Sequence, residues 1–484
     1  MIFNDLRDFI TFLENRNQIR RITIPVSTEL EITEIANRTV KAGGPALLFE
    51  NVEGSDMPLL INIYGTHQRT AWALGVDDVS ELSQRVKNLL SMIQEPPQGL
   101  VDKVRAAGEL LGVARAQPKL VPNGPCQEIV LSGAQVDLNR IPVLKCWPGD
   151  GGRFITLPLV ITRDPATGHR NVGTYRMQVY DRQMTGMHWQ THKVGAQHYR
   201  TGEEMKEQRL EVAVALGGDP TTVWSGSLPL PPGMDEIAVS GLIRNRAVEM
   251  VKCKTINLEV PAHAEIVLEG YVIPGELRKE GPFGDHTGYY SLEDDYPVFH
   301  VTAITHRKDP IYPTTIVGRP ATEDYYMGMA GVRLLLPALQ MNLPEVVDVG
   351  VPAEGIFHNL LIVSVRKEFP GHVRKVMYAL WGLGLLALTK TIIVVDHFVN
   401  VHDMSEVAWR VTSNIDPSRD VFFVDGPIDD LDHASQMPRY GSKMGIDATA
   451  KGAMDGRTRE WPDDIVMSEE IKDLVDSKWD EYKI

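Results

Sequence analysis

The middle third of the chain is a series of short β-type runs, and this pattern constrains the fold more than any other feature. Several runs alternate apolar and polar residues, as in 265–273, and turn-forming segments such as 148–152 separate them. One helix, over 235–246, is predicted to interrupt the series. Strands at this spacing predict an antiparallel barrel or sandwich rather than a parallel sheet. The predicted strands are 127–131, 155–162, 171–180, 221–225, 256–260, 264–272 and 299–305.

The first part of the chain mixes helices with strands. Apolar residues at helical spacing predict an amphipathic helix over 1–16, capped by Asn4. The apolar residues of this helix are Leu6, Phe9, Ile10 and Leu13. Further strands and helices are predicted at 46–52, 58–63, 78–93 and 100–113. Together they indicate a small α/β domain that ends near 115–125.

From about residue 325 the chain returns to alternating strands and helices. Dense apolar runs predict strands that are buried on both faces. These strands are at 344–351, 359–365, 391–396 and 421–425, with helices at 372–388 and 404–414. The last twenty residues predict an acidic helix that packs either on a partner subunit or on its own domain. Its apolar side carries Ile471, Leu474, Val475 and Trp479.

These patterns divide the chain into three units, in agreement with a length of 484 residues. We expect an N-terminal α/β domain with a connecting helix over 1–118, a central cofactor-binding β domain over 119–310, and a C-terminal α/β domain over 325–484. The net charge of −15 argues against a nucleic acid or an anionic membrane as partner. Three scattered cysteines and the lack of a signal sequence or an apolar run of membrane length predict a cytoplasmic protein without an integral membrane segment.

The segment Glu280-Gly-Pro-Phe-Gly-Asp285 places two carboxylates in a loop stiffened by proline. A guanidinium such as that of Arg176 would favour the ionised form of a nearby carboxylate, whereas two adjacent carboxylates raise one pKa. Such a set could keep one carboxyl charged and the other partly protonated, as general acid catalysis requires. An ordinary salt-bridge network is the alternative. A further alternative is that the two loop acids are simply exposed to solvent.

Asn171, Glu236 and one of two histidines, His192 or His188, form a second candidate set. Mixed oxygen and nitrogen ligands favour Mn²⁺ or Mg²⁺, with a phosphate completing the coordination shell. Each residue also has a structural interpretation, as a turn residue, a surface imidazole or an acid in the first turn of a helix. In a regular strand Asn171 and Arg176 would face opposite ways, so a shared site needs a bulge or a strand end between them.

These stretches, in this order, resemble the UbiD family of decarboxylases, which use prenylated FMN. The resemblance extends over nearly the whole chain. The motifs that carry it are Pro125-Cys-Gln-Glu128, Asn171-x-Gly-Thr-Tyr-Arg176, Trp189-x-Thr-His-Lys193, Glu236-x-Ala-x-x-Gly-Leu-Ile-Arg244, Glu280-Gly-Pro-Phe-Gly-Asp-His-Thr-Gly-Tyr-Tyr290, Thr389-Lys390 and Gly441-Ser-Lys-Met-Gly-Ile-Asp-Ala-Thr449.

The resemblance implies an α+β multidomain fold with a central flavin-reductase-like split β-barrel between two α/β domains. It implies that Arg176, Glu280 and Asp285 are catalytic, with Asp285 favoured as the acid, and that Asn171, His192 and Glu236 hold Mn²⁺. It places further contacts to prenylated FMN at Thr174, Tyr175, Arg176, His188, Trp189, Gln190, His192, Lys193, Glu236 and Lys390. Position alone suggests that Lys390 caps the preceding helix instead. The resemblance also implies a flavin prenyltransferase as cofactor supplier, a homodimer or homohexamer, and a K⁺ site of a kind common in the family.

The function implied by the resemblance is reversible, non-oxidative decarboxylation of an aromatic or α,β-unsaturated carboxylic acid. The stretch 280–290 favours a hydroxybenzoate or polyprenyl-hydroxybenzoate, because it is most similar to ubiquinone-pathway members. The alternatives are carboxylation or decarboxylation of a heteroaromatic or polycyclic acid, a non-catalytic flavin-binding subunit, and a flavin reductase. The complete acid–arginine–acid set argues against the second, and the lack of a Gly-rich dinucleotide fingerprint argues against the third.

Overall fold

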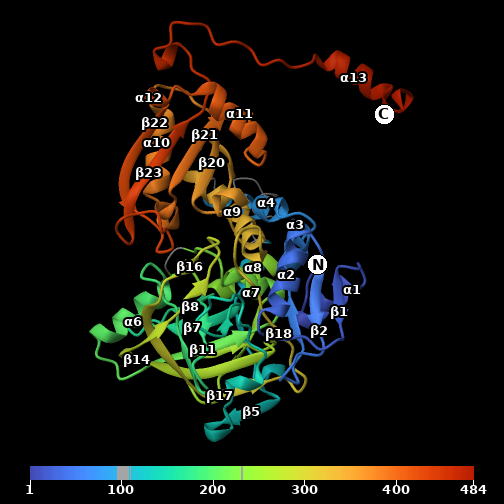
Figure 1. Ribbon diagram of the computed structural model, residues 1–484, viewed down its shortest axis with the longest axis vertical. Helices are drawn as coiled ribbons and strands as arrows, with labels where there is room; N and C mark the ends of the chain where they lie inside the picture. The colour runs from blue at the N-terminus through green and yellow to red at the C-terminus, as the bar shows by residue number, and fades with distance from the viewer. Residues whose placement is uncertain (95–107, 109–110, 231–232, 484) are drawn as a thin grey trace.

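The computed structural model of the protein describes residues 1–94, 108, 111–230 and 233–483. The predicted helix over 100–113 lies mostly outside these residues. The N-terminal and central parts lie side by side, and the C-terminal part stands on the other side of the long helix α9 (Glu323–Asn342) (Figure 1). This helix, which the sequence analysis did not predict, links the central part to the C-terminal part.

Helix α1 (Leu6–Glu14) begins at Asp5, whose side chain accepts hydrogen bonds from the backbone N–H groups of Arg7 and Asp8. The predicted cap was therefore one residue early, and Asn4 donates to Asp8 instead. The four predicted apolar residues of α1 are buried as expected. The N-terminal part also contains α2 (Glu31–Lys41), α3 (His67–Ala73), α4 (Ser80–Gln94), β1 (Ile19–Ile22), β2 (Ala46–Phe49) and β3 (Leu59–Ile61).

The N-terminal sheet has the order β1-β2-β3-β18, and β18 (Tyr312–Pro313) comes from beyond the central strands. One hydrophobic core contains Phe9 of α1, Leu159 of the central sheet and Leu334 of α9. The N-terminal and central parts therefore share a core and a strand. The C-terminal sheet packs in separate clusters.

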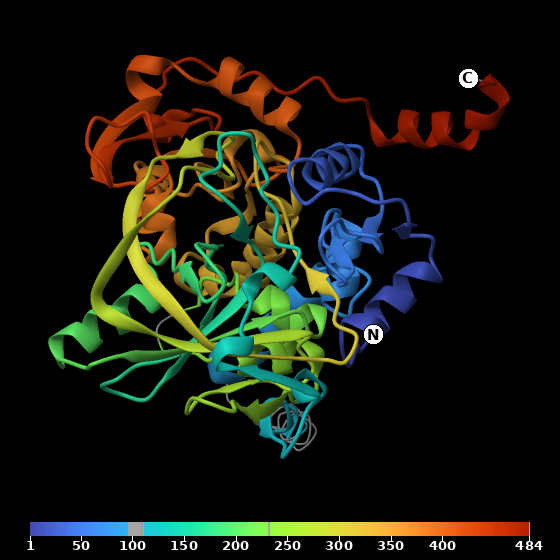
Figure 2. The same cartoon turned by 60° about the horizontal axis from the view of Figure 1, so that its bottom comes forward.

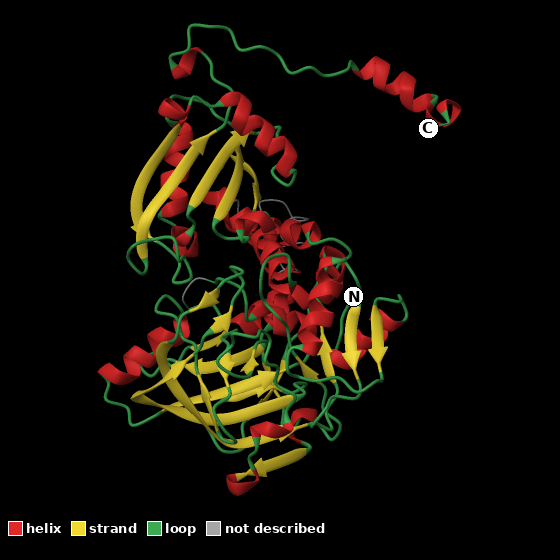
Figure 3. Cartoon of the chain, viewed as in Figure 1, coloured by secondary structure: helices red, strands yellow, loops and turns green. Residues whose placement is uncertain are grey.

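The central part is organised around a seven-stranded sheet whose neighbouring strands are all antiparallel (Figure 3). Its order is β10-β17-β14-β11-β7-β8, and β5 also pairs with β17. The strands are β5 (Ile129–Ser132), β7 (Pro158–Arg163), β8 (Arg170–Gly173), β10 (Met184–Gly186), β11 (Leu210–Leu216), β14 (Ile266–Glu280) and β17 (Asp294–His306). The antiparallel prediction is confirmed. In the described residues this path of strands stays open, so the split barrel remains a prediction.

Among the described residues, smaller sheets and three α-helices complete the central part. The strands are β4 (Lys119–Leu120), β6 (Phe154–Ile155), β9 (Met177–Gln178), β12 (Glu249–Lys252), β13 (Glu259–Pro261), β15 (Phe283–Gly284) and β16 (Tyr290–Ser291). The helices are α6 (Val194–Glu204), α7 (Pro220–Ser225) and α8 (Glu236–Arg244). The prediction of a strand over 221–225 is wrong. Asp219 caps a helix there by accepting from the N–H of Thr222, and Pro220 occupies the first helical position.

The C-terminal sheet has the order β19-β20-β21-β23-β22, with β20, β21 and β23 parallel to one another. Its elements are β19 (Val346–Gly350), β20 (Leu360–Val365), β21 (Thr391–Asp396), β22 (Val421–Pro427), β23 (Tyr440–Asp447), α10 (His372–Trp381), α11 (Met404–Asn414) and α12 (Pro417–Asp420). The helix predicted over 372–388 ends at Trp381, before Gly382, and a 3₁₀ helix over Gly384–Leu388 follows. Strand β23 was not predicted.

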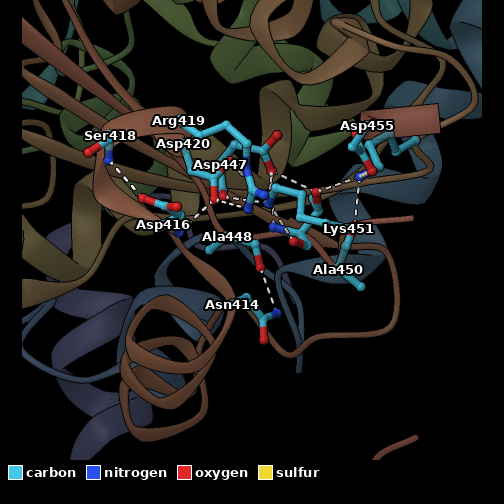
Figure 4. A network of polar contacts seen from close by, with 12 residues as sticks. Asn414, Asp416, Ser418, Arg419, Asp420, Asp447, Ala448, Ala450, Lys451 and Asp455 are labelled. Atoms are coloured by element: carbon cyan, nitrogen blue, oxygen red, sulfur yellow. Dashed lines mark hydrogen bonds and ion pairs between the residues drawn. The ribbon is translucent and has the colours of Figure 1, made fainter. Parts of the chain in front are cut away.

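A buried ion network lies beyond the carboxyl ends of the parallel strands (Figure 4). The Nζ of Lys451 lies 3.1 Å from Asp447 and 3.9 Å from Asp420, and Lys451 is 2% exposed. The Nζ of Lys367 donates to Asp455, and Asp396 accepts from the N–H of Ala450. Ligands often bind at this edge of open α/β sheets. Here the protein's own charged side chains pair with one another at this edge.

The terminal segment leaves the body of the protein (Figures 1 and 2). It contains α13 (Glu469–Ser477), and Ile471, Leu474 and Trp479 are all exposed. In this structure the predicted apolar side of the helix is therefore not buried against its own domain. In the part of the chain that the structure describes, no helix is both long and apolar enough to span a membrane.

Candidate active site

The long ribbon of β14 and β17 carries the loop that holds both predicted acids. Strand β14 ends at Glu280, which pairs in register with Asp294 at the start of β17. Figure 2 shows the two strands curving toward the C-terminal part. Between them β15 and β16 form a short hairpin, and the N–H of Asp285 in its turn donates to the carbonyl of Tyr289, at 3.0 Å. The loop predicted from its proline and glycines is thus a small hairpin at the tip of a longer one.

A third carboxylate, that of Asp150, anchors this hairpin and was not predicted from the sequence. Asp150 accepts from the N–H of Gly284 at 2.7 Å and from the N–H groups of Cys146 and Trp147 at 3.1 and 2.8 Å. The only hint in the sequence was its place in the turn 148–152. Asp150 anchors the loop through its backbone and makes no contact with Arg176 among the hydrogen bonds of the described residues.

Arg176 joins the two predicted acids. Its Nε donates to Glu280 Oε1 at 2.9 Å, its Nη1 pairs with Asp285 Oδ2, and its Nη2 donates to Ser291 Oγ at 3.0 Å. The guanidinium also lies over the ring of Phe283, 4.6 Å from its centroid. Strand β8 ends at Gly173 and β9 begins at Met177. The strand end required by the sequence analysis is therefore present, and Arg176 turns toward the loop.

His188 belongs to the same cluster. Its Nδ1 lies 2.8 Å from Glu280 Oε1, and its ring packs on that of Tyr296 with centroids 4.2 Å apart. Of the two histidines considered as metal ligands, His188 is thus placed beside the acids. Glu280 is 1% exposed and has two positively polarised partners on a single oxygen.

The structure lowers the pKa of both acids. Burial would raise the pKa of Glu280, but the charges and hydrogen bonds of His188 and Arg176 outweigh it. Burial would likewise raise the pKa of Asp285, and the charge of Arg176 together with hydrogen bonds from His286 holds it below its usual range. Both carboxyls are ionised at neutral pH. The expected split between one charged and one partly protonated acid is therefore wrong for this structure, because positive partners surround both groups.

Four buried polar atoms next to this cluster lack a hydrogen-bond partner within the described chain. They are Thr174 Oγ1, His188 Nε2, Trp189 Nε1 and Glu280 Oε2. Buried polar groups are nearly always satisfied, so unsatisfied ones gathered in one region indicate a bound group that supplies polar atoms. A flavin, with its ring carbonyls, ring nitrogens and phosphate, offers both donors and acceptors. Thr174, His188 and Trp189, three of the predicted cofactor residues, therefore fit such a group.

The predicted metal ligands come together only in part. Glu236 begins α8, and its Oε2 accepts from the N–H of Val172 at 3.0 Å, next to Asn171 on β8. Asn171 donates to the hydroxyl of Tyr175 at 3.3 Å. Burial raises the pKa of Glu236 to about 7 and outweighs the backbone hydrogen bonds and the charge of Arg170, which lower it.

His192 lies in the exposed turn before α6, and within the described residues it makes no hydrogen bond or ion pair with Asn171 or Glu236. Across the described residues no three His, Cys, Asp or Glu side chains are placed to hold one ion. The predicted set contains only two residues of those types. Its oxygen ligands, a buried carboxylate and an amide, suit Mn²⁺ or Mg²⁺.

The two lysines among the predicted cofactor residues, Lys193 and Lys390, lie in different surroundings. The N–H of Lys193 donates to the carbonyl of Gln190 at 2.9 Å, and burial lowers the pKa of the Lys193 ammonium. Lys390 Nζ lies 2.7 Å from Asp432 Oδ2, so in this structure it neither caps a helix nor stands free. Lys443 instead binds the end of the 3₁₀ helix over Gly384–Leu388, because its Nζ donates to the carbonyls of Ala387 and Thr389.

Three family models match successive parts of the chain. The N-terminal, Rift-related and C-terminal domains of 3-octaprenyl-4-hydroxybenzoate carboxy-lyase match residues 10–88, 119–320 and 325–448. The chain belongs to the UbiD family. An uncharacterized protein of Archaeoglobus fulgidus is 49% identical over 484 residues, which is 100% of this chain and 99% of that protein.

Solved UbiD-class structures have the same fold. Vanillic acid decarboxylase of Sedimentibacter hydroxybenzoicus in closed form is 26% identical, with a TM-score of 0.86 and 100% of both chains covered. The UbiD-class enzyme HmfF of Pelotomaculum thermopropionicum, in complex with FMN, is 29% identical, with a TM-score of 0.80 and 98% and 99% covered. An evolved dimeric form of HmfF, in complex with prFMN, is 27% identical, with a TM-score of 0.77 and with 97% of this chain and 98% of that chain covered.

Proposed function

We propose that this UbiD-family protein is a reversible, non-oxidative decarboxylase of a hydroxybenzoate or polyprenyl-hydroxybenzoate that uses prenylated FMN. The observation that carries the proposal is the convergence of Glu280 and Asp285 on one guanidinium, that of Arg176. The family models named for a carboxy-lyase, the vanillic acid decarboxylase and the flavin-bound HmfF structures support it.

The bound flavin would supply an electron sink for the departing carboxylate, and the protein would supply orientation and electrostatics. Thr174, His188 and Trp189 have the unsatisfied polar atoms that would contact it, while Asn171 and Glu236 would hold a divalent cation for its phosphate. Arg176 would orient the two acids. Asp285 would return a proton to the substrate carbon, and Glu280 would hold Arg176 and His188 in place.

The decisive experiment is co-expression with a flavin prenyltransferase, followed by the intact mass of the released cofactor and assays of CO₂ release. We expect a flavin heavier than FMN by one isoprenyl unit, and CO₂ release from 4-hydroxybenzoate or vanillate. A bound flavin without turnover of any aromatic acid would contradict the catalytic proposal. It would favour a flavin-binding subunit instead.

We further propose that the protein assembles through α13 into homodimers or into homohexamers built from dimers. Its exposed apolar residues and its position away from the body support this. The evolved dimeric form of HmfF gives a precedent among relatives.

A further inference from the structure

His286 connects the predicted acid with the C-terminal part of the protein. Its Nδ1 lies 2.8 Å from Asp285 Oδ1, and its backbone N–H donates to the same oxygen at 2.8 Å. Its Nε2 lies 2.7 Å from the Nε2 of His358, which precedes β20. His286 belongs to the motif 280–290, in which it had no assigned role, and no sequence pattern singled out His358.

The segment before His358 has an unusual backbone that brings it to His286. Ile356 and Phe357 have φ angles of 54° and 41°, in the left-handed region that β-branched and bulky residues rarely adopt. The ring of Phe357 lies 5.5 Å from that of His286 and 6.5 Å from that of Tyr325. Strained backbone of this kind is characteristic of functional segments.

The pKa values of the two histidines shift in opposite directions. Burial lowers the pKa of His286, but the hydrogen bond and charge of Asp285 outweigh it and raise the pKa above the ordinary value. Burial and the charge of His286 lower the pKa of His358. With a proton on each ring nitrogen, His286 would donate through Nδ1 to Asp285 and through Nε2 to His358, whose own Nε2 would accept. The charged groups that face the pair are Asp285, Arg176, Asp324 of α9, Asp429 after β22 and Lys193 before α6.

Decarboxylation consumes one proton in each turnover. The bond between the substrate carbon and the carboxylate breaks, CO₂ leaves, and the electron pair that stays on the carbon takes up a proton. Asp285 is the acid nearest to this task, yet Arg176 and His286 keep it ionised in the structure. A proton delivered through Asp285 therefore needs a donor beside it, and His286 Nδ1 lies within hydrogen-bond distance of Asp285 Oδ1, at 2.8 Å.

We propose that His286 stores the proton that Asp285 delivers, and that His358 positions His286 from the C-terminal part. The Nδ1 proton of the imidazolium passes to Asp285 Oδ1 and from there to the substrate carbon, which leaves Asp285 ionised and His286 neutral. After product release, Nδ1 regains a proton from water. This inference rests on the proposed function and adds to it the source of the proton.

The first test needs neither flavin nor substrate. Histidine ring NMR of the flavin-free protein follows the titration of His286, with His286→Asn identifying its signal. We expect a pKa above 6.5, the ordinary value, in the wild type. In Asp285→Asn the pKa should fall, because burial is no longer opposed. A neutral His286 at pH 6.5, or no change in Asp285→Asn, would overturn the proposal.

The second test uses the flavin-loaded enzyme with vanillate and ¹³C-labelled bicarbonate. In His286→Asn we expect product formation to fall by roughly 10²-fold or more, the usual effect of losing an acid–base group. Exchange of labelled CO₂ into vanillate should continue, because bond cleavage precedes protonation. The alkaline decline of the wild-type rate, where His286 loses its proton, should disappear from the pH profile.

Matched variants separate proton storage from folding. His358→Phe should reduce product formation more than exchange, whereas His300→Asn, which alters a histidine bonded to Glu276 on the outer part of the ribbon, should change neither. An equal loss of exchange and product formation in His286→Asn would show a purely structural role and refute the proposal. If the wild type turns over no hydroxybenzoate, the proposed function fails, and the NMR titration still decides where the proton resides.

Discussion

Arg176 and Glu280 are 104 positions apart in the sequence, and their side chains meet in a hydrogen bond of 2.9 Å. The contact forms because β8 ends three residues before Arg176 and because β14 carries Glu280 to the tip of the ribbon. The same guanidinium binds Asp285 across the hairpin. The guanidinium of Arg176 thus links the carboxylates of Glu280 and Asp285.

Glu280→Gln should abolish decarboxylation and leave the cofactor bound. Glutamine retains an oxygen that can accept from Arg176 and His188, so the cluster keeps its shape but loses a negative charge. We expect CO₂ release to fall by roughly 10²–10⁴-fold. Glu276→Gln, on the same strand with a side chain 38% exposed, is the control. Normal turnover of Glu280→Gln would remove Glu280 from the catalytic set.

Arg176→Met should destabilise the protein at neutral pH by about 3–5 kcal/mol, because two buried carboxylates lose their shared cation. In the wild type the pKa of each acid is lowered, so their stabilising contribution is present above their unfolded pKa values and lost as the pH falls through the folded ones. The difference between variant and wild type should therefore shrink below about pH 4. Denaturant unfolding at both pH values measures it, and a constant difference would contradict the assignment.

Glu236→Gln and Asn171→Ala should lose metal and flavin together, because both residues would hold the cation that binds the flavin phosphate. Metal content by mass spectrometry and flavin absorbance are the measurements. Glu249→Gln, at a half-exposed glutamate bonded to His263, is the matched control. Full retention of flavin in both variants would refute the metal roles.

Replacement of His188 and of His192 should have different effects on metal content and turnover. His188→Ala should keep its metal and lose turnover, because His188 contacts Glu280. His192→Ala should lose metal if the exposed turn before α6 closes onto Asn171 and Glu236 when the ion binds. Metal loss in His188→Ala with full retention in His192→Ala would reverse the assignment.

Lys451→Met should destabilise the C-terminal part by about 3–5 kcal/mol, since it leaves Asp447 and Asp420 uncompensated in a buried network. Arg38→Met removes an exposed pair with Glu34 and should cost less than about 1 kcal/mol. Thermal unfolding of the two variants gives the comparison. Equal effects would mean that the network in Figure 4 adds nothing beyond a surface ion pair.

Ile471→Asp combined with Leu474→Asp should dissociate the proposed oligomer, because charges would replace the exposed apolar side of α13. Lys472→Glu, in the same helix, keeps the apolar side and should leave assembly unchanged. Light scattering after size-exclusion chromatography reports the mass. An unchanged mass in the double variant would place the subunit interface elsewhere.

Local sequence signals predicted the elements well where periodicity and caps agree. The apolar residues of α1, the apolar runs of the C-terminal sheet and the antiparallel middle third all follow from side-chain patterns of one element. One error arose where short polar signals outweighed an apolar run. At 221–225, a cap at Asp219 and a proline started a helix in residues that otherwise favour a strand.

The sequence by itself determined which residue types stand in the candidate site, because the motifs with Arg176, Glu280 and Asp285 can be identified without coordinates. Only the tertiary structure decided their surroundings. It placed His188 on Glu280, Asp150 under the hairpin and His358 against His286. These contacts join segments that are remote in the chain, and they depend on sheet register and on the way α9 sets the C-terminal part over the central one. Contacts with Arg176, His188 and His286 lower the pKa values of the two acids, since a carboxyl responds to charges that are close in space, whether or not they are close in sequence.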